Sequence, residues 1–277
     1  MNQGIEHRYL DLMKKTLAFT LWPEPPIPIE TFNEERTPLK RTLVSAVSRI
    51  LQSRNLRLMK EPGISTEDKE AGRIWPGCAD TMIGLERLDN LQSCVESVLQ
   101  ENVPGDLIET GVWRGGACIF MRAILAAWAV EDRKVYVADS FEGLPKPDAE
   151  KYPADQGDTH HTHSFLAVSQ TEVENNFRRF SLLDDQVGFL KGWFKDSLPN
   201  APLEKLAILR LDGDMYGSTM DALIHLYPKL SPGGFCIIDD YALDGCKQAV
   251  DDFRVEHRIY GEMQEVDWAC RYWRKGS

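Results

Sequence analysis

The sequence lacks several features that would assign it to a class at once. It has no excess of basic residues, because 32 Lys and Arg stand against 43 Asp and Glu, for a formal net charge of −11. An acidic chain of this kind is poorly suited to nucleic acid or to an anionic membrane surface. We find no signal-peptide pattern and no apolar run long enough to cross a bilayer, so we expect a cytoplasmic protein that binds neither nucleic acid nor membrane.

Paired cysteines and repeats are also missing. The six cysteines are scattered, and none forms a Cys-x-x-Cys pair. This spacing resembles neither a zinc site nor the disulfide framework of a small secreted domain. With 43% hydrophobic and 27% charged residues among 277, the chain has the composition of an ordinary globular protein with a sizeable core.

The first 80 residues are interpreted as a helical extension, followed by the main domain at 81–277. Residues 1–20 show an amphipathic helix pattern, and 41–51 suggest a second helix. Between them, 22–28 holds four prolines, which remove backbone donors and predict an extended connector. We expect the extension to contact the main domain, a partner subunit or the substrate, and the first helix to join a homo-oligomer contact near the active site. Its expected apolar stripe is Tyr9, Leu12, Met13, Thr16, Leu17 and Thr20.

From residue 81 onward helix and strand patterns alternate, which predicts an α/β fold. Helices are expected at 85–100, 117–130, 168–180 and 245–253, strands at 134–138, 186–191, 206–211 and 233–238, and a closing antiparallel hairpin at 258–262 and 268–273.

A short strand from residue 105 leads into a glycine-rich turn at Gly111, Gly115 and Gly116. Glycine lets the backbone approach a ligand, and the N-terminus of the next helix offers free N–H groups. The spacing matches neither a Walker A loop nor the Gly-x-Gly-x-x-Gly dinucleotide fingerprint. The loop therefore indicates a cofactor site only in combination with the strand that comes after it.

That strand ends in Asp139, roughly 30 residues after Gly111, where an acid can bind the two hydroxyls of a ribose. This position suits NAD and S-adenosylmethionine equally. The simpler interpretation, an Asp that only forms a turn, is weaker because strand, loop and acid occur in the expected order. A third strand ends in Gly192 and Trp193, and Trp193 either covers a purine or belongs to the core.

Two further strands each end in a pair of acids. The apolar run 206–211 is interrupted only by Arg210 and stops at Asp212-Gly213-Asp214, and 233–238 stops at Asp239-Asp240. If the strands are parallel neighbours, four carboxylates meet at one rim and raise one another's pKa. Either pair alone reads as turn-forming or helix-capping Asp. The repetition favours a bound cation, and oxygen ligands favour Mg²⁺, Mn²⁺ or Ca²⁺ over zinc.

A long polar stretch, 146–164, lies after the second strand of the main domain. It contains two acids and three histidines, namely Asp155, Asp158, His160, His161 and His163. Their spacing matches no standard zinc pattern, so a mobile active-site loop is the preferred interpretation.

Four motifs in fixed order carry a resemblance to a known family. They are IETGVWRGG (108–116), ADSFEGLP (138–145), LDGDMYGST (211–219) and GGFCIIDDY (233–241), and RYLDLMKKT (8–16) extends the likeness. Together they resemble the macrocin O-methyltransferase family, class I S-adenosylmethionine-dependent methyltransferases that methylate sugar hydroxyls on macrolide and aminocoumarin antibiotics. The resemblance covers nearly the whole chain.

The resemblance implies a Rossmann-like, mostly parallel sheet, S-adenosylmethionine and Mg²⁺. Glu109, Gly111 and their neighbours would line the methionine part of the cofactor, and Asp139 with Ser140 would hold the ribose. The expected cofactor-binding set is Thr81, Glu109, Thr110, Gly111, Val112, Trp113, Asp139, Ser140, Phe141, Gly192 and Trp193. Asp212, Asp239 and Asp240 would bind Mg²⁺ and Asp214 would be the general base, with the roles of Asp212 and Asp214 interchangeable.

The expected activity is Mg²⁺-dependent methyl transfer to a hydroxyl, on a sugar of a glycosylated small molecule. A phenol or catechol O-methyltransferase is the closest alternative. An Mg²⁺-dependent hydrolase leaves the glycine-rich loop and Asp139 without a role, and the intact set of rim acids argues against a non-catalytic cofactor-binding scaffold.

Overall fold

A twisted sheet with strand order β5-β4-β3-β6-β7-β9-β8 runs through the centre of the protein, in a computed structural model that describes residues 4–32 and 37–276. Strands β3 to β7 pair in parallel, and β9 runs antiparallel to both β7 and β8. The expected Rossmann-like sheet with a C-terminal antiparallel hairpin is confirmed. The strands are β3 (Asp106–Thr110), β4 (Val135–Asp139), β5 (Val187–Lys191), β6 (Leu206–Leu211), β7 (Leu230–Ile238), β8 (Gln264–Glu265) and β9 (Arg271–Arg274).

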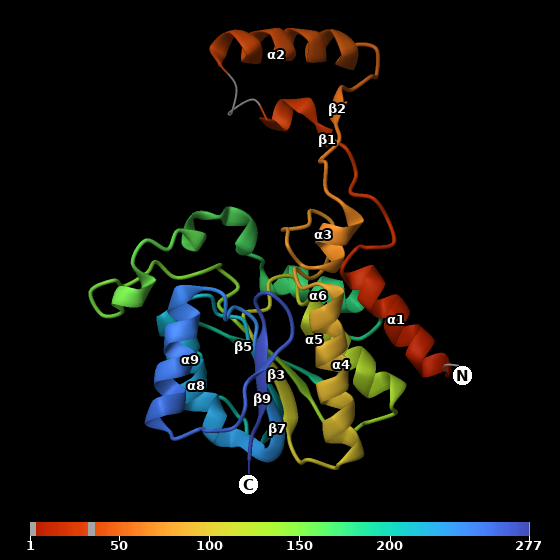
Figure 1. The fold of residues 1–277 in the computed structure, drawn as a ribbon. Helices are drawn as coiled ribbons and strands as arrows, with labels where there is room; N and C mark the ends of the chain where they lie inside the picture. Colours follow the sequence, from red (N-terminus) through yellow and green to blue (C-terminus); the bar gives the residue numbers. More distant parts are fainter. Residues whose placement is uncertain (1–3, 33–36, 277) are drawn as a thin grey trace.

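Helices cover both faces of the sheet, with α4 and α5 on one side and α8 and α9 on the other (Figure 1). Side chains of β3 and β6 alternate between the two resulting cores: Ile208 joins the α4–α5 side and Leu209 the α8–α9 side. This burial on both faces explains why 206–211 reads as a continuous apolar run. The helices are α4 (Leu85–Gln100), α5 (Gly116–Ala127), α6 (Gln170–Arg179), α7 (Phe194–Ser197), α8 (Tyr216–Leu226) and α9 (Asp244–Glu256).

The closing hairpin begins later than the sequence suggests. Residues 258–262, expected as its first arm, are not a strand: Arg258 has φ 56° and the Ile259 N–H bonds to the carbonyl of Arg254, so they complete the end of α9. The first arm is β8 instead. The second arm starts at Arg271 because residues before it turn around Asp267, whose carboxylate accepts from the N–H of Ala269.

Helix α1 (Ile5–Leu17) is part of the main core. Its buried side chains Leu10, Met13 and Leu17 pack against α5 and α4. Met13 and Leu17 of the expected stripe are buried and Tyr9 packs against the core, but Leu12 is 54% exposed and Leu10, which the stripe left out, is fully buried. The proposed boundary at residue 80 stays a prediction, since α1 shares the core of the later helices.

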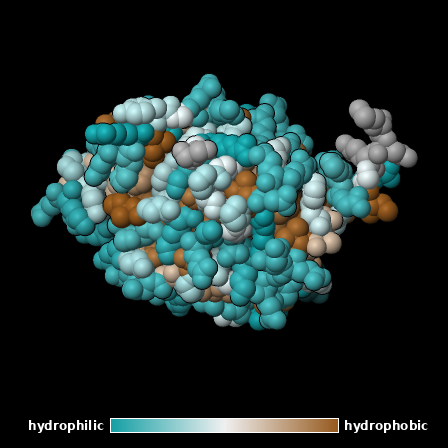
Figure 2. Space-filling view, turned by 90° about the horizontal axis from the view of Figure 1, so that it is seen from below, coloured by the Kyte–Doolittle hydropathy of each residue, from teal (hydrophilic) through white to brown (hydrophobic). Residues whose placement is uncertain are grey.

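A separate arm stands away from this body (Figure 1). It carries α2 (Pro38–Gln52) on a two-stranded ladder of β1 (Ile27–Pro28) and β2 (Met59–Lys60), with the short α3 (Thr66–Glu70) leading back to the body. The expected second helix and extended connector are both confirmed. No helix in the described ranges is long and apolar enough to pass through a membrane. The face seen from below is largely hydrophilic, with apolar side chains in small separate patches (Figure 2).

Candidate active site

A cavity of about 860 Å³ opens at the carboxyl ends of the parallel strands. Gly111 comes after β3, Asp139 ends β4, Asp212 comes after β6 and Asp239 after β7, and all four line the cavity. In the sheet, β4 lies next to β3 on one side and β6 lies next to it on the other, so the strand order reverses direction at β3. The cavity thus lies at the topological switch point, where open α/β sheets bind their ligands.

The glycine-rich loop is packed directly against the loop that comes after β6. Gly111 has φ 81°, and a Cβ added there would lie 1.7 Å from the carbonyl oxygen of Asp212. The Asp212 N–H bonds to the carbonyl of Thr110 at 2.9 Å. Only glycine permits this approach, so the glycine-rich loop and the acid-bearing loop are held in one fixed relation.

Asp139 links the glycine-rich loop to the turn that comes directly after β4. Its carboxylate accepts from the N–H of Val112 at 2.8 Å and from the N–H of Phe141 at 2.7 Å. Burial raises the pKa of Asp139, although these N–H donors oppose the shift. The acid therefore ends β4, accepts hydrogen bonds from the glycine-rich loop and lines the cavity.

Most of the expected cofactor residues meet in this cavity. Those that line it are Thr81, Glu109, Gly111, Val112, Trp113, Asp139, Ser140, Gly192 and Trp193. Thr110 and Phe141 are buried beside the cavity without lining it, and Phe141 packs against Phe189.

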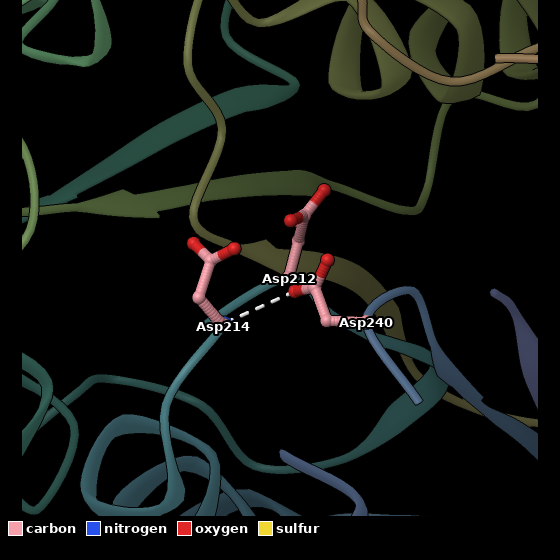
Figure 3. Close-up of side chains that lie close together, drawn as sticks. All are labelled: Asp212, Asp214 and Asp240. Atoms are coloured by element: carbon pink, nitrogen blue, oxygen red, sulfur yellow. Dashed lines mark hydrogen bonds between the residues drawn. The ribbon is translucent and has the colours of Figure 1, made fainter. Parts of the chain in front are cut away.

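Three carboxylates form a cluster on the other side of the cavity. Oxygens of Asp212, Asp214 and Asp240 lie within 4.8 Å of one another, and Figure 3 shows the three side chains close together. Asp214 has φ 57°, and its N–H bonds to the Asp240 carboxylate at 3.0 Å. Burial, with the neighbouring charges, raises the pKa of Asp212 and of Asp240, and burial raises the pKa of Asp214 to about 6. Such a set of oxygen donors fits a divalent cation.

Asp239 lies outside this cluster because two arginines hold it. Arg210, 1% exposed, donates to one oxygen of Asp239, and Arg87 donates to the other at 2.8 Å. The paired charges keep the pKa of Asp239 below its usual range, against the effect of burial. Arg210 also donates to Glu109 and, at 2.9 Å, to Asp212, so one guanidinium links the ends of three strands.

Sequence reasoning missed Arg87, although a signal was present. It lies in the first turn of α4, between the apolar positions Leu85 and Leu88, and is 7% exposed. A basic residue this close to an apolar helix face indicates a buried partner. Its partners Asp239 and Asp267 are far away in the chain and could not be assigned from spacing.

The polar stretch 146–164 is anchored at the active site. Asp155, 4% exposed, accepts from the N–H groups of Tyr216 at 2.6 Å and Gly217 at 3.2 Å, and so caps α8 directly after Asp214. His160 lines the cavity and pairs with Asp158 at 2.7 Å. The three histidines lie outside the carboxylate cluster, and two of them, His160 and His163, contact Trp75 instead.

Comparison with known proteins gives consistent matches. The macrocin O-methyltransferase (TylF) family matches residues 6–275. Mycinamicin III 3''-O-methyltransferase of Micromonospora griseorubida is 53% identical over 223 residues, 79% of this chain and 88% of the relative. The 8-demethyl-8-(2,3-dimethoxy-α-L-rhamnosyl)-tetracenomycin-C 4'-O-methyltransferase of Streptomyces olivaceus is 48% identical over 275 residues, 99% of this chain and 95% of the relative. Demethyldecarbamoylnovobiocin O-methyltransferase of Streptomyces niveus is 47% identical over 269 residues, 96% and 93% respectively.

A solved structure has the same fold over nearly the whole chain. The O-methyltransferase NovP superimposes with a TM-score of 0.83 at 45% identity, covering 98% of this chain and 100% of that chain. The calicheamicin methyltransferase CalS11, with a TM-score of 0.55 at 17% identity over 87% and 95% of the two chains, shares the fold alone.

Proposed function

Because the chain belongs to the macrocin O-methyltransferase family and is an O-methyltransferase, we propose that it methylates a sugar hydroxyl of a glycosylated small molecule, using S-adenosylmethionine and Mg²⁺. One observation carries this proposal: the glycine-rich loop with Asp139 and the carboxylate cluster face the same cavity. The relatives named for mycinamicin III, tetracenomycin and novobiocin support a glycosylated acceptor. The six free cysteines support the cytoplasm as its location.

The carboxylates divide between holding the metal and removing the proton. Asp212 and Asp240 would hold Mg²⁺, and Asp239, which its two arginines keep outside the cluster, would join them through the lone pairs left free. When bound, the ion lowers the pKa of the acceptor hydroxyl and fixes its orientation. Asp214 is the general base: it accepts the hydroxyl proton as the oxygen bonds to the methyl carbon and the carbon–sulfur bond breaks, leaving S-adenosylhomocysteine.

The acceptor class is tested by mass spectrometry of complete reactions. The panel holds mycinamicin III, demethyldecarbamoylnovobiocin and catechol, each with S-adenosylmethionine and Mg²⁺. We expect a gain of one methyl group on a sugar of a glycoside. Methylation of catechol alone would instead identify a phenol-type enzyme.

S-adenosylhomocysteine and S-adenosylmethionine should raise the melting temperature, while NAD should not. A ligand at 100 times its Kd stabilises the native state by about 2.7 kcal/mol. Asp139→Asn should reduce the shift, because it removes the charge that binds the ribose, whereas Asp185→Asn, at an exposed position, should not. Differential scanning fluorimetry measures all of these, and a shift with NAD alone overturns the cofactor assignment.

Mg²⁺ should bind more tightly as the pH rises, because its proposed ligands Asp212 and Asp240 both have raised pKa values. The raised pKa values of the cluster mean that protons stay on these carboxylates to higher pH, and Mg²⁺ must displace them. Calorimetry at a pH near 6, in two buffers of different ionisation enthalpy, should therefore detect proton release. Equal affinity one unit below and one unit above that pH would contradict the prediction.

The arm should join two or more copies of the chain. Leu39, Leu43 and Ile50 are 83%, 66% and 62% exposed on α2, whereas the apolar face of α1, first expected to make this contact, is covered by α5. Residues 37–60 also hold six of the 32 basic residues and none of the 43 acidic ones, which suits the acidic surface of a second copy. The contact we propose is therefore made by the arm.

Light scattering tests this assembly. Wild type should exceed the mass of one subunit, and changing Leu39, Leu43 and Ile50 together to Ser should return it to one. Val255→Ser, at a 77% exposed position on α9, is the control and should leave the mass unchanged. If wild type has the mass of one subunit at micromolar concentration, the predicted assembly is wrong.

A further inference from the structure

Two tryptophans on the cavity wall have no role in the proposed chemistry. Trp75 and Trp268 both line the cavity, and they are 51% and 56% exposed. An indole ring is among the largest apolar surfaces that a side chain offers, and it gains most when a partner covers it. Two such rings in one cavity indicate a ligand surface.

Both rings are held in place before any ligand arrives. The indole N–H of Trp268 bonds to the carbonyl of Ala71 at 3.2 Å, and its ring lies over the Arg87 guanidinium at 5.2 Å. Trp75 packs against Phe165, with ring centroids 5.1 Å apart, and against His163 at 5.4 Å. A flat ligand therefore meets rings that lose little freedom on binding, which favours affinity.

The two rings line one cavity and are connected through one segment of the chain. Trp268 donates a hydrogen bond to the carbonyl of Ala71. Trp75 lies four residues after Ala71, so the two Cα atoms are at most about 14 Å apart even in an extended chain. Ile74, between them in sequence, also lines the cavity. We call Ile74, Trp75 and Trp268 the apolar wall.

The apolar wall stands beside the carboxylate cluster. Arg87, beneath Trp268, bonds to Asp239, the neighbour of Asp240 in the chain. On the other side, the ring centroids of Trp75 and His160 are 6.3 Å apart, and His160 lines the same cavity as Asp214. The apolar wall and the carboxylate cluster therefore line one cavity that a single molecule can span.

We propose that Trp75 and Trp268 are specificity-determining residues that bind the flat, apolar aglycone of the acceptor while its sugar lies at the carboxylate cluster. The inference rests on the proposed function, which supplies the sugar hydroxyl. Recognition of the acceptor then depends on its aglycone as well as on its sugar. A sugar ring alone buries less apolar area on this surface than a flat aromatic aglycone does, so the aglycone gains more from it.

The test compares two probes with the same sugar. Binding of 4-methylumbelliferyl α-L-rhamnoside and of methyl α-L-rhamnoside is measured by calorimetry on the full chain loaded with S-adenosylhomocysteine and Mg²⁺. Wild type should bind the aryl glycoside at least about tenfold more tightly, as expected for stacking on two aromatic rings. Trp75→Ala and Trp268→Ala should each remove most of that difference, and the Phe variants should keep it.

Trp22→Ala is the matched control, because Trp22 is 47% exposed but lies outside the cavity. It should leave both affinities unchanged. The proposal is overturned if wild type binds the two probes equally or binds neither, or if the two cavity variants behave like Trp22→Ala. Failure of the proposed function is separate, since it appears as loss of the S-adenosylhomocysteine-induced rise in melting temperature.

Discussion

Asp214→Asn should lower turnover by roughly 10²–10⁴-fold, the usual loss when a general base is removed. The substitution keeps the local structure, because Asn tolerates the left-handed φ of 57° at this position and retains the N–H that bonds to Asp240. Binding of Mg²⁺ and of S-adenosylmethionine should therefore stay nearly intact. Added Mg²⁺ should not restore the rate.

The matched variants are Asp212→Asn, Asp239→Asn and Asp240→Asn. Each keeps an oxygen but removes a charge, so each should weaken Mg²⁺ binding, and added Mg²⁺ should recover part of the rate. Calorimetric Mg²⁺ titration and methylation rates for the four variants separate the roles. If Asp214→Asn regains activity at high Mg²⁺ and Asp212→Asn does not, Asp214 is the ligand and Asp212 the base.

Arg210→Met should lower the free energy of unfolding by about 3–5 kcal/mol, the typical loss when one partner of a buried ion pair is removed. The guanidinium is 1% exposed and donates to Glu109, Asp212 and Asp239. Without it these carboxylates meet in a region from which water is largely excluded. Two of them, Glu109 and Asp212, already have pKa values raised by burial.

Urea denaturation followed by circular dichroism measures this loss. Arg178→Met is the matched control, because Arg178 pairs with Glu174 on the surface of α6 and is 54% exposed. Exposed pairs of this type contribute about 0–1 kcal/mol. Equal effects from the two variants would mean that Arg210 has no special part in the stability of the site.

The sequence predicts best those features that depend on neighbouring residues. The bounds of α4 and β6 agree with the expected 85–100 and 206–211, because each pattern is set by residues within one element. Asp139 was placed correctly at the rim because parallel strands put their carboxyl ends on one side of a sheet. The family resemblance then added which cofactor these ends would hold.

Features that the sequence does not predict depend on contacts between distant residues. Asp239 and Asp240 are adjacent, yet they differ because Arg87, 152 residues before Asp239, pairs with Asp239 and not with Asp240. The anchoring of 146–164 depends on Asp155 reaching the start of α8. In the apolar wall, the segment that contains Trp75 accepts a hydrogen bond from the indole N–H of Trp268, and no local sequence pattern indicates that contact.

The position of α1 also has a consequence for synthesis on the ribosome. The helix ends at Leu17, but its partner α5 begins only at Gly116. At roughly 5–20 residues per second, the ribosome needs about 5–20 s to make the intervening 100 or so residues. Throughout that time Leu10, Met13 and Leu17 lack their main packing partner, so the nascent chain exposes the apolar face of this helix to chaperones before the sheet is complete.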